Sequence, residues 1–288
     1  MTNFKRFSLL FALLLATALT AVAQNGAGES KYAKLGANKI HYKSYGKGKD
    51  ALVLVHCWSC NLELWRDHIP ELSKRARVVA LDLPGHGLSD KPETTYSMDF
   101  FADAIDAVMK DAGVEHAVLV GHSMGTPVVR QFYRKYPQKT LGLVIVDGAL
   151  RPFGTKEQRE QFAAPLRGPK YKEAGAQMFA AMSATLSDAD KERIKTSFSN
   201  TPQYVLVSSM DAMGDDAIYT PDKINVPVLA LLAKSPFWPP DTEQFLRSLA
   251  PDLEFEMWEG VSHFLFMDKP KEFNAAVIAF LDKKKLLK

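Results

Sequence analysis

The pentapeptide Gly121-His122-Ser123-Met124-Gly125 lies between an apolar run typical of a buried strand, Ala117–Val120, and a stretch with helical spacing, Thr126–Tyr136. Glycine on both sides of the serine permits a sharp turn, because a Cβ at either position would collide with neighbouring backbone. Such a turn exposes the serine hydroxyl and places the next backbone N–H at a helix N-terminus, where negative charge is stabilised. The pentapeptide therefore predicts a nucleophile, provided that a histidine and a carboxylate reach it.

Apolar and amphipathic segments alternate along the rest of the chain, which is typical of a mostly parallel sheet with crossover helices. The expected strands are Lys39–Tyr45, Leu52–His56, Arg77–Leu81, Ala117–Val120, Leu141–Val146, Val228–Leu232 and Glu254–Trp258. The expected helices are Leu64–Ser73, Met98–Ala112, Thr126–Tyr136, Asp241–Leu249 and Lys271–Lys284. The predicted fold class is α/β.

This alternation stops between residues 150 and 220. The stretch has no run typical of a buried strand, is rich in Ala, Lys, Glu, Gln and Met, and indicates several short helices. It follows the Leu141–Val146 strand, where an inserted segment would cover a site at the carboxyl ends of the strands. We therefore expect a helical cap at 150–220, inserted into a core formed by 24–149 and 221–288.

The N-terminal residues have the pattern of a secretory signal peptide. Lys5 and Arg6 precede an apolar run, Phe7–Val22, and Ala21-Val22-Ala23 matches a cleavage site. A membrane anchor is the alternative, but the run is shorter than the roughly 20 residues of a spanning helix. We expect a signal peptide at 1–23, cleavage after Ala23, a secreted or periplasmic protein, and no stable membrane span after cleavage.

Charge and motif content give no indication of a nucleic-acid partner or of a cofactor. Loss of Lys5 and Arg6 would lower the formal net charge from +3 to +1, so nothing indicates nucleic-acid binding. The chain has two cysteines, Cys57 and Cys60, too few for a disulfide framework that would hold a small fold together. The chain has no H-E-x-x-H motif and no phosphate-binding loop, and we expect neither a metal nor an organic cofactor.

Four motifs, in this order along the chain, resemble those of the α/β-hydrolase superfamily. Val53–Trp58 resembles its oxyanion turn, Asp82–Asp90 its D-x-x-G-x-G-x-S loop, Gly121–Gly125 its nucleophile elbow, and Gly260–Phe264 with Lys269-Pro270 its histidine loop. The resemblance covers nearly all of the chain from residue 24 onward, apart from the cap. It implies an α/β-hydrolase fold with Ser123 as the nucleophile.

Chain order then identifies the base. The superfamily runs nucleophile, acid, histidine, and of seven histidines only His263 follows Ser123. Three others, His56, His86 and His122, belong to motifs, and we expect them to orient loops through hydrogen bonds.

The acid departs from the resemblance. The family usually places it in a turn after the strand that follows the cap, but that turn holds Pro236, which cannot orient an imidazole. Asp147, at the end of the Leu141–Val146 strand, and Asp241, at the start of a helix, are the alternatives. An aspartate at a helix start is also a good N-cap, and we favour Asp147.

The resemblance assigns the oxyanion hole to the backbone N–H groups of Trp58 and Met124. Cys57 stands where the family has glycine, and with Cys60 it forms C-x-x-C. We expect both cysteines to be free, buried thiols. A disulfide between them, closed in an oxidising compartment, is the alternative.

Together these features predict a carboxylesterase-like serine hydrolase that cleaves a small apolar ester, lactone or thioester through an acyl-enzyme. Phe153, Trp238 and Phe264 are the candidate pocket residues. Another acyl or C–C hydrolase, an aminopeptidase, an acyltransferase, a cofactor-free perhydrolase, or a non-catalytic binding protein on the same fold remains open. Haloalkane dehalogenases and epoxide hydrolases are disfavoured, because their nucleophile is aspartate.

Overall fold

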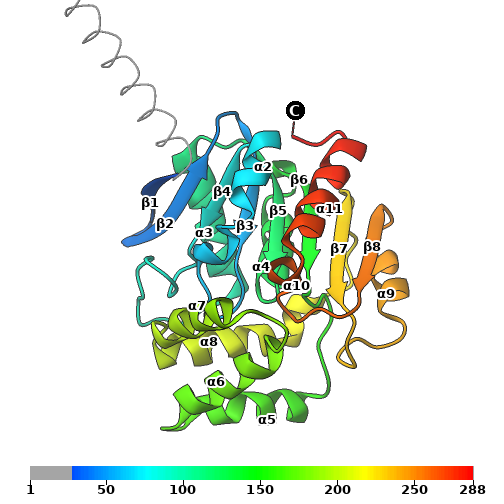
Figure 1. Cartoon of the computed structure of the whole chain (residues 1–288). Coiled ribbons are helices and arrows are strands. Elements are labelled where there is room, and N and C mark those ends of the chain that lie inside the picture. The colour runs from blue at the N-terminus through cyan, green and yellow to red at the C-terminus, as the bar shows by residue number, and fades with distance from the viewer. Residues whose placement is uncertain (1–27, 288) are drawn as a thin grey trace, which may run out of the picture.

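The computed structural model describes residues 28–287, so the predicted signal peptide at 1–23 lies outside the described residues and remains a prediction. Eight strands form one sheet in the order β1-β2-β4-β3-β5-β6-β7-β8 (Figure 1). The pairs β1–β2 and β2–β4 are antiparallel, and all other neighbours are parallel. The strands are β1 (Glu29–Leu35), β2 (Asn38–Tyr45), β3 (Asp50–Val55), β4 (Val78–Leu81), β5 (His116–His122), β6 (Thr140–Val146), β7 (Val228–Ala233) and β8 (Leu253–Trp258).

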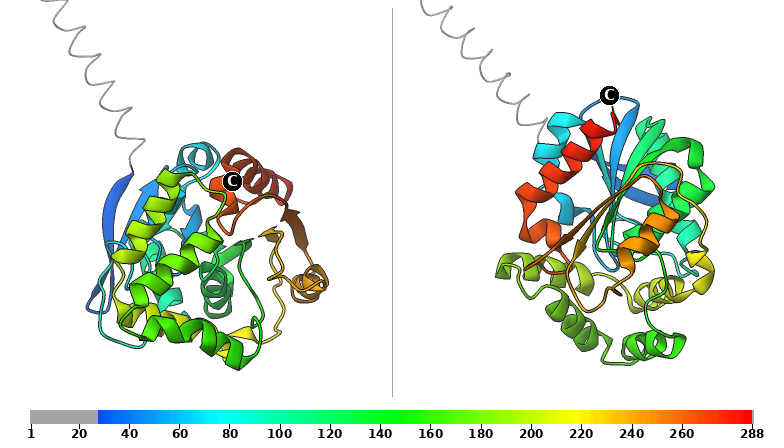
Figure 2. Two further views of the ribbon diagram at one scale, coloured as in Figure 1. Left: turned by 60° about the horizontal axis from the view of Figure 1, so that its bottom comes forward. Right: turned by 90° about the vertical axis from the view of Figure 1, so that its right-hand side faces the viewer.

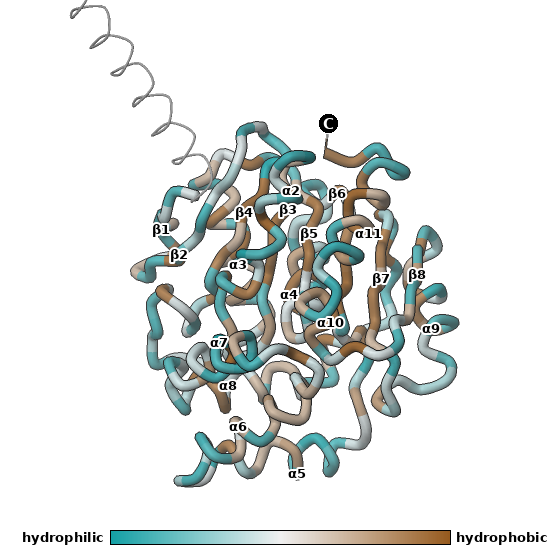
Figure 3. The backbone as a smooth tube through the Cα atoms, in the orientation of Figure 1, coloured by the Kyte–Doolittle hydropathy of each residue, from teal (hydrophilic) through white to brown (hydrophobic). Residues whose placement is uncertain are grey.

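The central strands read as continuous Val, Leu, Ile and Ala runs because both faces of the sheet are covered. Figure 2 shows α2 and α11 on one face and α3, α4 and α9 on the other. Figure 3 shows the hydrophobic colour concentrated on these strands. The helices around the sheet are α2 (Ile69–Arg75), α3 (Met98–Ala112), α4 (Gly125–Lys135), α9 (Thr242–Leu249), α10 (Leu265–Asp268) and α11 (Pro270–Lys283), with 3₁₀ turns η1 (Leu62–Trp65) and η2 (Pro137–Lys139). No helix within residues 28–287 is long and apolar enough to cross a membrane.

The chain between β6 and β7 forms a layer of helices, which Figure 1 shows below the sheet, where the parallel strands end. It contains α5 (Lys156–Arg167), α6 (Tyr171–Met182), α7 (Asp188–Ser199), α8 (Gln203–Gly214) and the 3₁₀ turn η3 (Asp216–Tyr219). A capping box at Thr155 starts α5, since Thr155 and Gln158 each bind the other's backbone N–H. These helices lie over the edge of the sheet that holds Ser123.

The α/β fold class predicted from the sequence is confirmed, and three local expectations were wrong. Strand β1 was missed: it is an edge strand with mostly exposed side chains, so it lacks a buried apolar run. The expected helix Leu64–Ser73 is divided into η1 and α2, because Pro70 begins a new helix in its first turn. The single turn α10 was too short to show a period.

Candidate active site

Ser123 occupies a strained turn between β5 and α4. Its φ is 54°, in the left-handed region that non-glycine residues rarely adopt. A Cβ on Gly121 would lie 2.4 Å from the Gly125 carbonyl oxygen, and a Cβ on Gly125 would lie 2.6 Å from that of Val55. The Ser123 N–H donates to the Val146 carbonyl at 2.9 Å, which ties the turn to β6. Only glycine fits on either side of this serine, as the sequence predicted.

Asp147 and His263 meet beside this turn. Asp147 follows β6 with a φ of 43°, and its Oδ2 lies 2.6 Å from His263 Nδ1. The Asp147 side chain is 8% exposed and that of His263 is 20% exposed. Because an ionised carboxylate only accepts hydrogen bonds, Nδ1 of His263 carries the proton and Nε2 is the basic nitrogen.

Ser123 and His263 line one cavity, although the structure shows no hydrogen bond between the Ser123 hydroxyl and the ring. Such bonds are commonly long before substrate binds. The histidine loop is held from two sides. The His263 N–H donates to the Met182 carbonyl of α6 at 3.1 Å, and the His263 carbonyl accepts from His122 Nε2 at 2.9 Å.

Asp241, the alternative acid, lies elsewhere. It occupies the N-cap position of α9 without a capping hydrogen bond from its side chain. Its carboxylate pairs with Arg151 at 2.6 Å, and the side chain is 57% exposed. Asp241 has no contact with His263 among the hydrogen bonds and ion pairs of residues 28–287. Of the two candidate acids, the structure therefore brings only Asp147 to the imidazole.

Of the two residues expected to supply the oxyanion donors, Met124 is next to Ser123 in the chain and Trp58 lines the same cavity as Ser123. Met124 follows it at the start of α4, and Trp58 follows β3, the neighbour of β5 in the sheet. Within the described part of the chain, neither backbone N–H donates a hydrogen bond. Both are therefore free to bind an oxyanion. The Trp58 indole instead donates to the Leu206 carbonyl of α8 at 3.0 Å.

The expectation of free thiols was wrong, because Cys57 and Cys60 form a disulfide. It closes a four-residue turn around Trp58, in which Ser59 has a φ of 54°. Two Cys positions three apart do not reveal from the sequence whether the turn between them brings the sulfurs together. The structure supplies that turn, which the Cys60 N–H to Cys57 carbonyl hydrogen bond of 3.2 Å also closes.

The other motif histidines make hydrogen bonds between loops. His56 Nδ1 donates to the Cys57 carbonyl at 2.7 Å, and its Nε2 accepts from the Leu83 N–H at 2.9 Å. His86 Nδ1 donates to the Pro84 carbonyl at 2.9 Å. Burial lowers the pKa of His56, lowers that of His86 to about 3 and holds that of His122 well below its usual range. These three rings are neutral at neutral pH.

The cavity over Ser123 has a volume of about 630 Å³. Its walls come from the loops after β3, β5, β6, β7 and β8 and from α5, α6 and α8. Apart from Asp147 and His263, no acidic or basic side chain among residues 28–287 lines it; the apolar lining is Trp58, Phe153, Phe162, Met178, Phe179, Ala181, Met182, Ala184, Met210, Met213, Ala233, Phe237, Trp238 and Val261. Such a lining favours an uncharged, apolar substrate.

Two of the three predicted pocket aromatics, Phe153 and Trp238, line this cavity. Phe264 does not. It is fully buried behind His263 and packs against His122 and Phe179. The sequence also missed the methionines and phenylalanines of α5, α6 and α8. Their helical spacing was the available signal, but it does not distinguish a face that packs on the core from one that lines a cavity.

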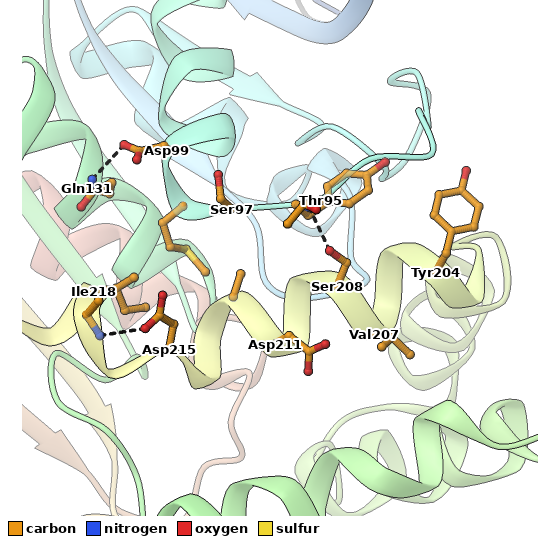
Figure 4. A pocket seen from close by; sticks show the side chains of 14 residues that line it. Thr95, Ser97, Asp99, Gln131, Tyr204, Val207, Ser208, Asp211, Asp215 and Ile218 are labelled. Atoms are coloured by element: carbon orange, nitrogen blue, oxygen red, sulfur yellow. Dashed lines mark hydrogen bonds between the residues drawn. The ribbon is translucent and has the colours of Figure 1, made fainter.

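A second cavity of about 710 Å³ lies on the other side of α8 (Figure 4). Its serines have structural partners: Ser208 accepts from the Tyr96 N–H at 2.9 Å, and Ser97 caps α3. No histidine of the described chain lines it. It therefore offers no nucleophile beside a base, and the cavity over Ser123 is the candidate active site.

No group of three or more His, Cys, Asp or Glu side chains in residues 28–287 is arranged to hold a metal ion.

Comparisons with known proteins agree with the geometry. A sequence profile described as the alpha/beta hydrolase fold matches residues 50–270. An uncharacterized protein of Mycobacterium tuberculosis (strain CDC 1551 / Oshkosh) is 27% identical over 81% of this chain and 75% of its own.

Two solved structures are similar over their whole length. An esterase from Exiguobacterium antarcticum has a TM-score of 0.79 at 17% identity, with 88% of this chain and 100% of that chain covered. Est816, described as an N-acyl homoserine lactone degrading enzyme, has a TM-score of 0.71 at 26% identity, with 86% and 99% covered. The profile covers most of the chain and the elbow lies inside it, so this protein belongs to the alpha/beta hydrolase fold family.

Proposed function

We propose that this protein is a serine hydrolase that cleaves small apolar esters through an acyl-enzyme, with Ser123, His263 and Asp147 as its catalytic triad. One observation carries the proposal: His263 is hydrogen-bonded to Asp147 and opens, with Ser123, into the same apolar cavity. The esterase among its structural neighbours shares the fold, and fold alone does not assign the substrate.

Each residue has a defined part in this reaction. The Ser123 oxygen attacks the ester carbonyl carbon, and its proton passes to Nε2 of His263. Asp147, bonded to Nδ1, holds the ring tautomer and stabilises the imidazolium. His263 then gives the proton to the departing alcohol, and a water activated by the same nitrogen releases the acid. The N–H groups of Trp58 and Met124 stabilise the oxyanion, and one such donor contributes a factor of about 10²–10³ in rate.

The cavity supports the substrate class. A charged acyl or alcohol group would lose its hydration without finding a partner, since the Asp147–His263 pair supplies the only acidic or basic side chains that the described residues place in the wall. The helices α5–α8 act in this proposal as the cap that shields the bound substrate from bulk solvent, while the single water that deacylation needs reaches His263. An uncharged lactone is an internal ester of the same class, and the relative Est816 is described as degrading one.

The test is Ser123→Ala, assayed with p-nitrophenyl butyrate and by labelling with a fluorophosphonate probe. We expect the variant to lose the label and at least about 10⁴-fold in kcat, because the nucleophile is removed. Ser208→Ala is the matched control: it changes the serine of the second cavity and keeps activity and label. Turnover that survives in Ser123→Ala, or a folded wild type that neither turns over nor takes the label, would contradict the proposal. The second result would favour a non-catalytic binding protein.

A further inference from the structure

The loop that follows β7 contacts the acid at the active site although it supplies no acid itself. Pro236 stands at the position where the α/β-hydrolase pattern has its carboxylate. Two groups on either side of Pro236 nevertheless hydrogen-bond to Asp147. The Ala233 N–H donates to Asp147 Oδ1 at 2.8 Å, and the Trp238 indole Nε1–H donates to the same oxygen at 3.2 Å.

These two donors leave the other oxygen to the histidine. Asp147 Oδ2 is bonded to His263 Nδ1 at 2.6 Å, so one carboxylate oxygen serves the loop and one serves the ring. A carboxylate turns easily about its last bond, because that torsion is broad. Donors fixed on Oδ1 hold the plane of the group and keep Oδ2 aimed at the imidazole.

The indole is itself held in place. The Trp238 backbone N–H donates to the Ser235 carbonyl at 3.3 Å, which closes the turn that contains Pro236. The ring packs edge to face on Phe237, with centroids 4.9 Å apart and planes at 84°. Trp238 also lines the cavity over Ser123, so the indole joins the substrate wall to the acid.

We propose that Trp238 is a positioning residue for the hydrolase reaction: its indole N–H fixes the Asp147 carboxylate that orients His263. This inference rests on the function proposed above. It assigns the loop after β7 a part in catalysis, as the second donor to an acid that comes from β6. The role needs a side chain that is both an N–H donor and an apolar wall, and tryptophan provides both.

The pH dependence of the reaction should report this role. A donor on Oδ1 withdraws negative charge from the carboxylate, so its loss makes Asp147 a stronger partner for the imidazolium. The acid limb of kcat/KM should then move to higher pH. The other titratable groups near Asp147 and His263 are neutral or have partners. Burial keeps His122 neutral. Lys234 pairs with Glu259 and Arg151 with Asp241, and Asp268 accepts hydrogen bonds from the Ser262 and Thr185 hydroxyls.

The variant is Trp238→Phe, which keeps an aromatic ring and removes the N–H. We expect kcat for p-nitrophenyl butyrate to fall about tenfold, KM to change less than about threefold, and the acid limb to rise by a few tenths of a pH unit. Trp258→Phe is the matched control. It removes the same kind of bond, from the Trp258 indole to Glu256 at 2.8 Å on β8. Trp258 pairs with Ala233 in the sheet, but its indole donates to Glu256 and not to Asp147 or His263, and we expect unchanged kinetics.

Wild-type protein provides a second measurement that does not depend on folding of the Trp238 variant. In proton NMR the indole N–H signal of Trp238 should exchange slowly with solvent, and faster in Asp147→Ala. Unchanged exchange in Asp147→Ala, or a folded Trp238→Phe with wild-type kcat and pH profile, would overturn the inference. If Ser123→Ala keeps its activity, the proposed function fails first. If Ser123→Ala is inactive while Trp238→Phe keeps wild-type kinetics, the proposed function stands and the role of Trp238 fails.

Discussion

Replacement of Asp147 by asparagine tests the site most directly, because the structure dictates how the amide must lie. Asp147 Oδ1 accepts from two fixed donors, the Ala233 N–H and the Trp238 indole. In Asp147→Asn the amide oxygen must therefore take the Oδ1 position, since an NH₂ group there would face two donors without an acceptor. The NH₂ group is then left at the Oδ2 position, which lies 2.6 Å from His263 Nδ1 in the wild type.

This orientation forces the wrong tautomer on the imidazole. Nδ1 of His263 must accept from the amide, so the ring proton moves to Nε2, and Nε2 no longer accepts the proton of Ser123. The lost charge adds a second effect, because the imidazolium formed in the reaction has no anionic partner. A loss of the same kind in a serine-protease triad costs about 10⁴ in kcat. We expect kcat of Asp147→Asn to fall by about 10³–10⁴ with KM little changed.

The assay is hydrolysis of p-nitrophenyl butyrate near neutral pH, with the thermal midpoint measured alongside it. Asp241→Asn is the matched control: it makes the same chemical change at the other candidate acid, whose carboxylate pairs with Arg151 at the surface. We expect this variant to keep its activity within about twofold, because exposed ion pairs contribute little. If Asp147→Asn stays within about tenfold of wild type, or if Asp241→Asn loses activity instead, the assignment of the acid is wrong.

Two further predictions concern the disulfide and a buried histidine. Replacing both Cys57 and Cys60 by serine should lower the free energy of unfolding by about 2 kcal/mol, the chain-entropy value for a four-residue loop, and should lower kcat by loosening the Trp58 turn. Dithiothreitol should reproduce both losses in wild type and have no effect on the double variant. If kcat of the wild type does not respond to dithiothreitol, the disulfide does not support the oxyanion turn. His68 is buried, which lowers its pKa to about 4, so the unfolded chain binds its proton first as the pH falls from about 6.5 to 4 and stability is lost over that window. Between pH 7 and pH 4, the free energy of unfolding of His68→Phe, measured in urea, should fall by up to about 3 kcal/mol less than that of wild type. Parallel curves of unfolding free energy against pH for the two proteins would refute this.

Much of the fold was predictable because its signals are local. The central strands are apolar on both faces, and a run of Val, Leu and Ile marks them without knowledge of their neighbours. Helix α3 has the predicted bounds Met98–Ala112, with Ser97 as its N-cap and the left-handed Gly113 at its end. Ser123 is marked by the glycines around it, and His263 by its place in the chain. Strand β1 lacked such a signal, because only its backbone pairing makes it a strand.

The sequence by itself determined the α/β class, the turn that carries Ser123 and the one histidine downstream of it, because each depends on residues close together in the chain or on chain order. Only the tertiary structure decided which carboxylate meets His263, since Asp147 and His263 lie 116 residues apart and the sheet order brings them together. It also closed the Cys57–Cys60 disulfide, placed Phe264 behind the site, and turned one face of α6 and α8 into the cavity wall. The physical reason is the same in each case: spacing along the chain predicts which face a side chain occupies, but not what the fold sets opposite that face.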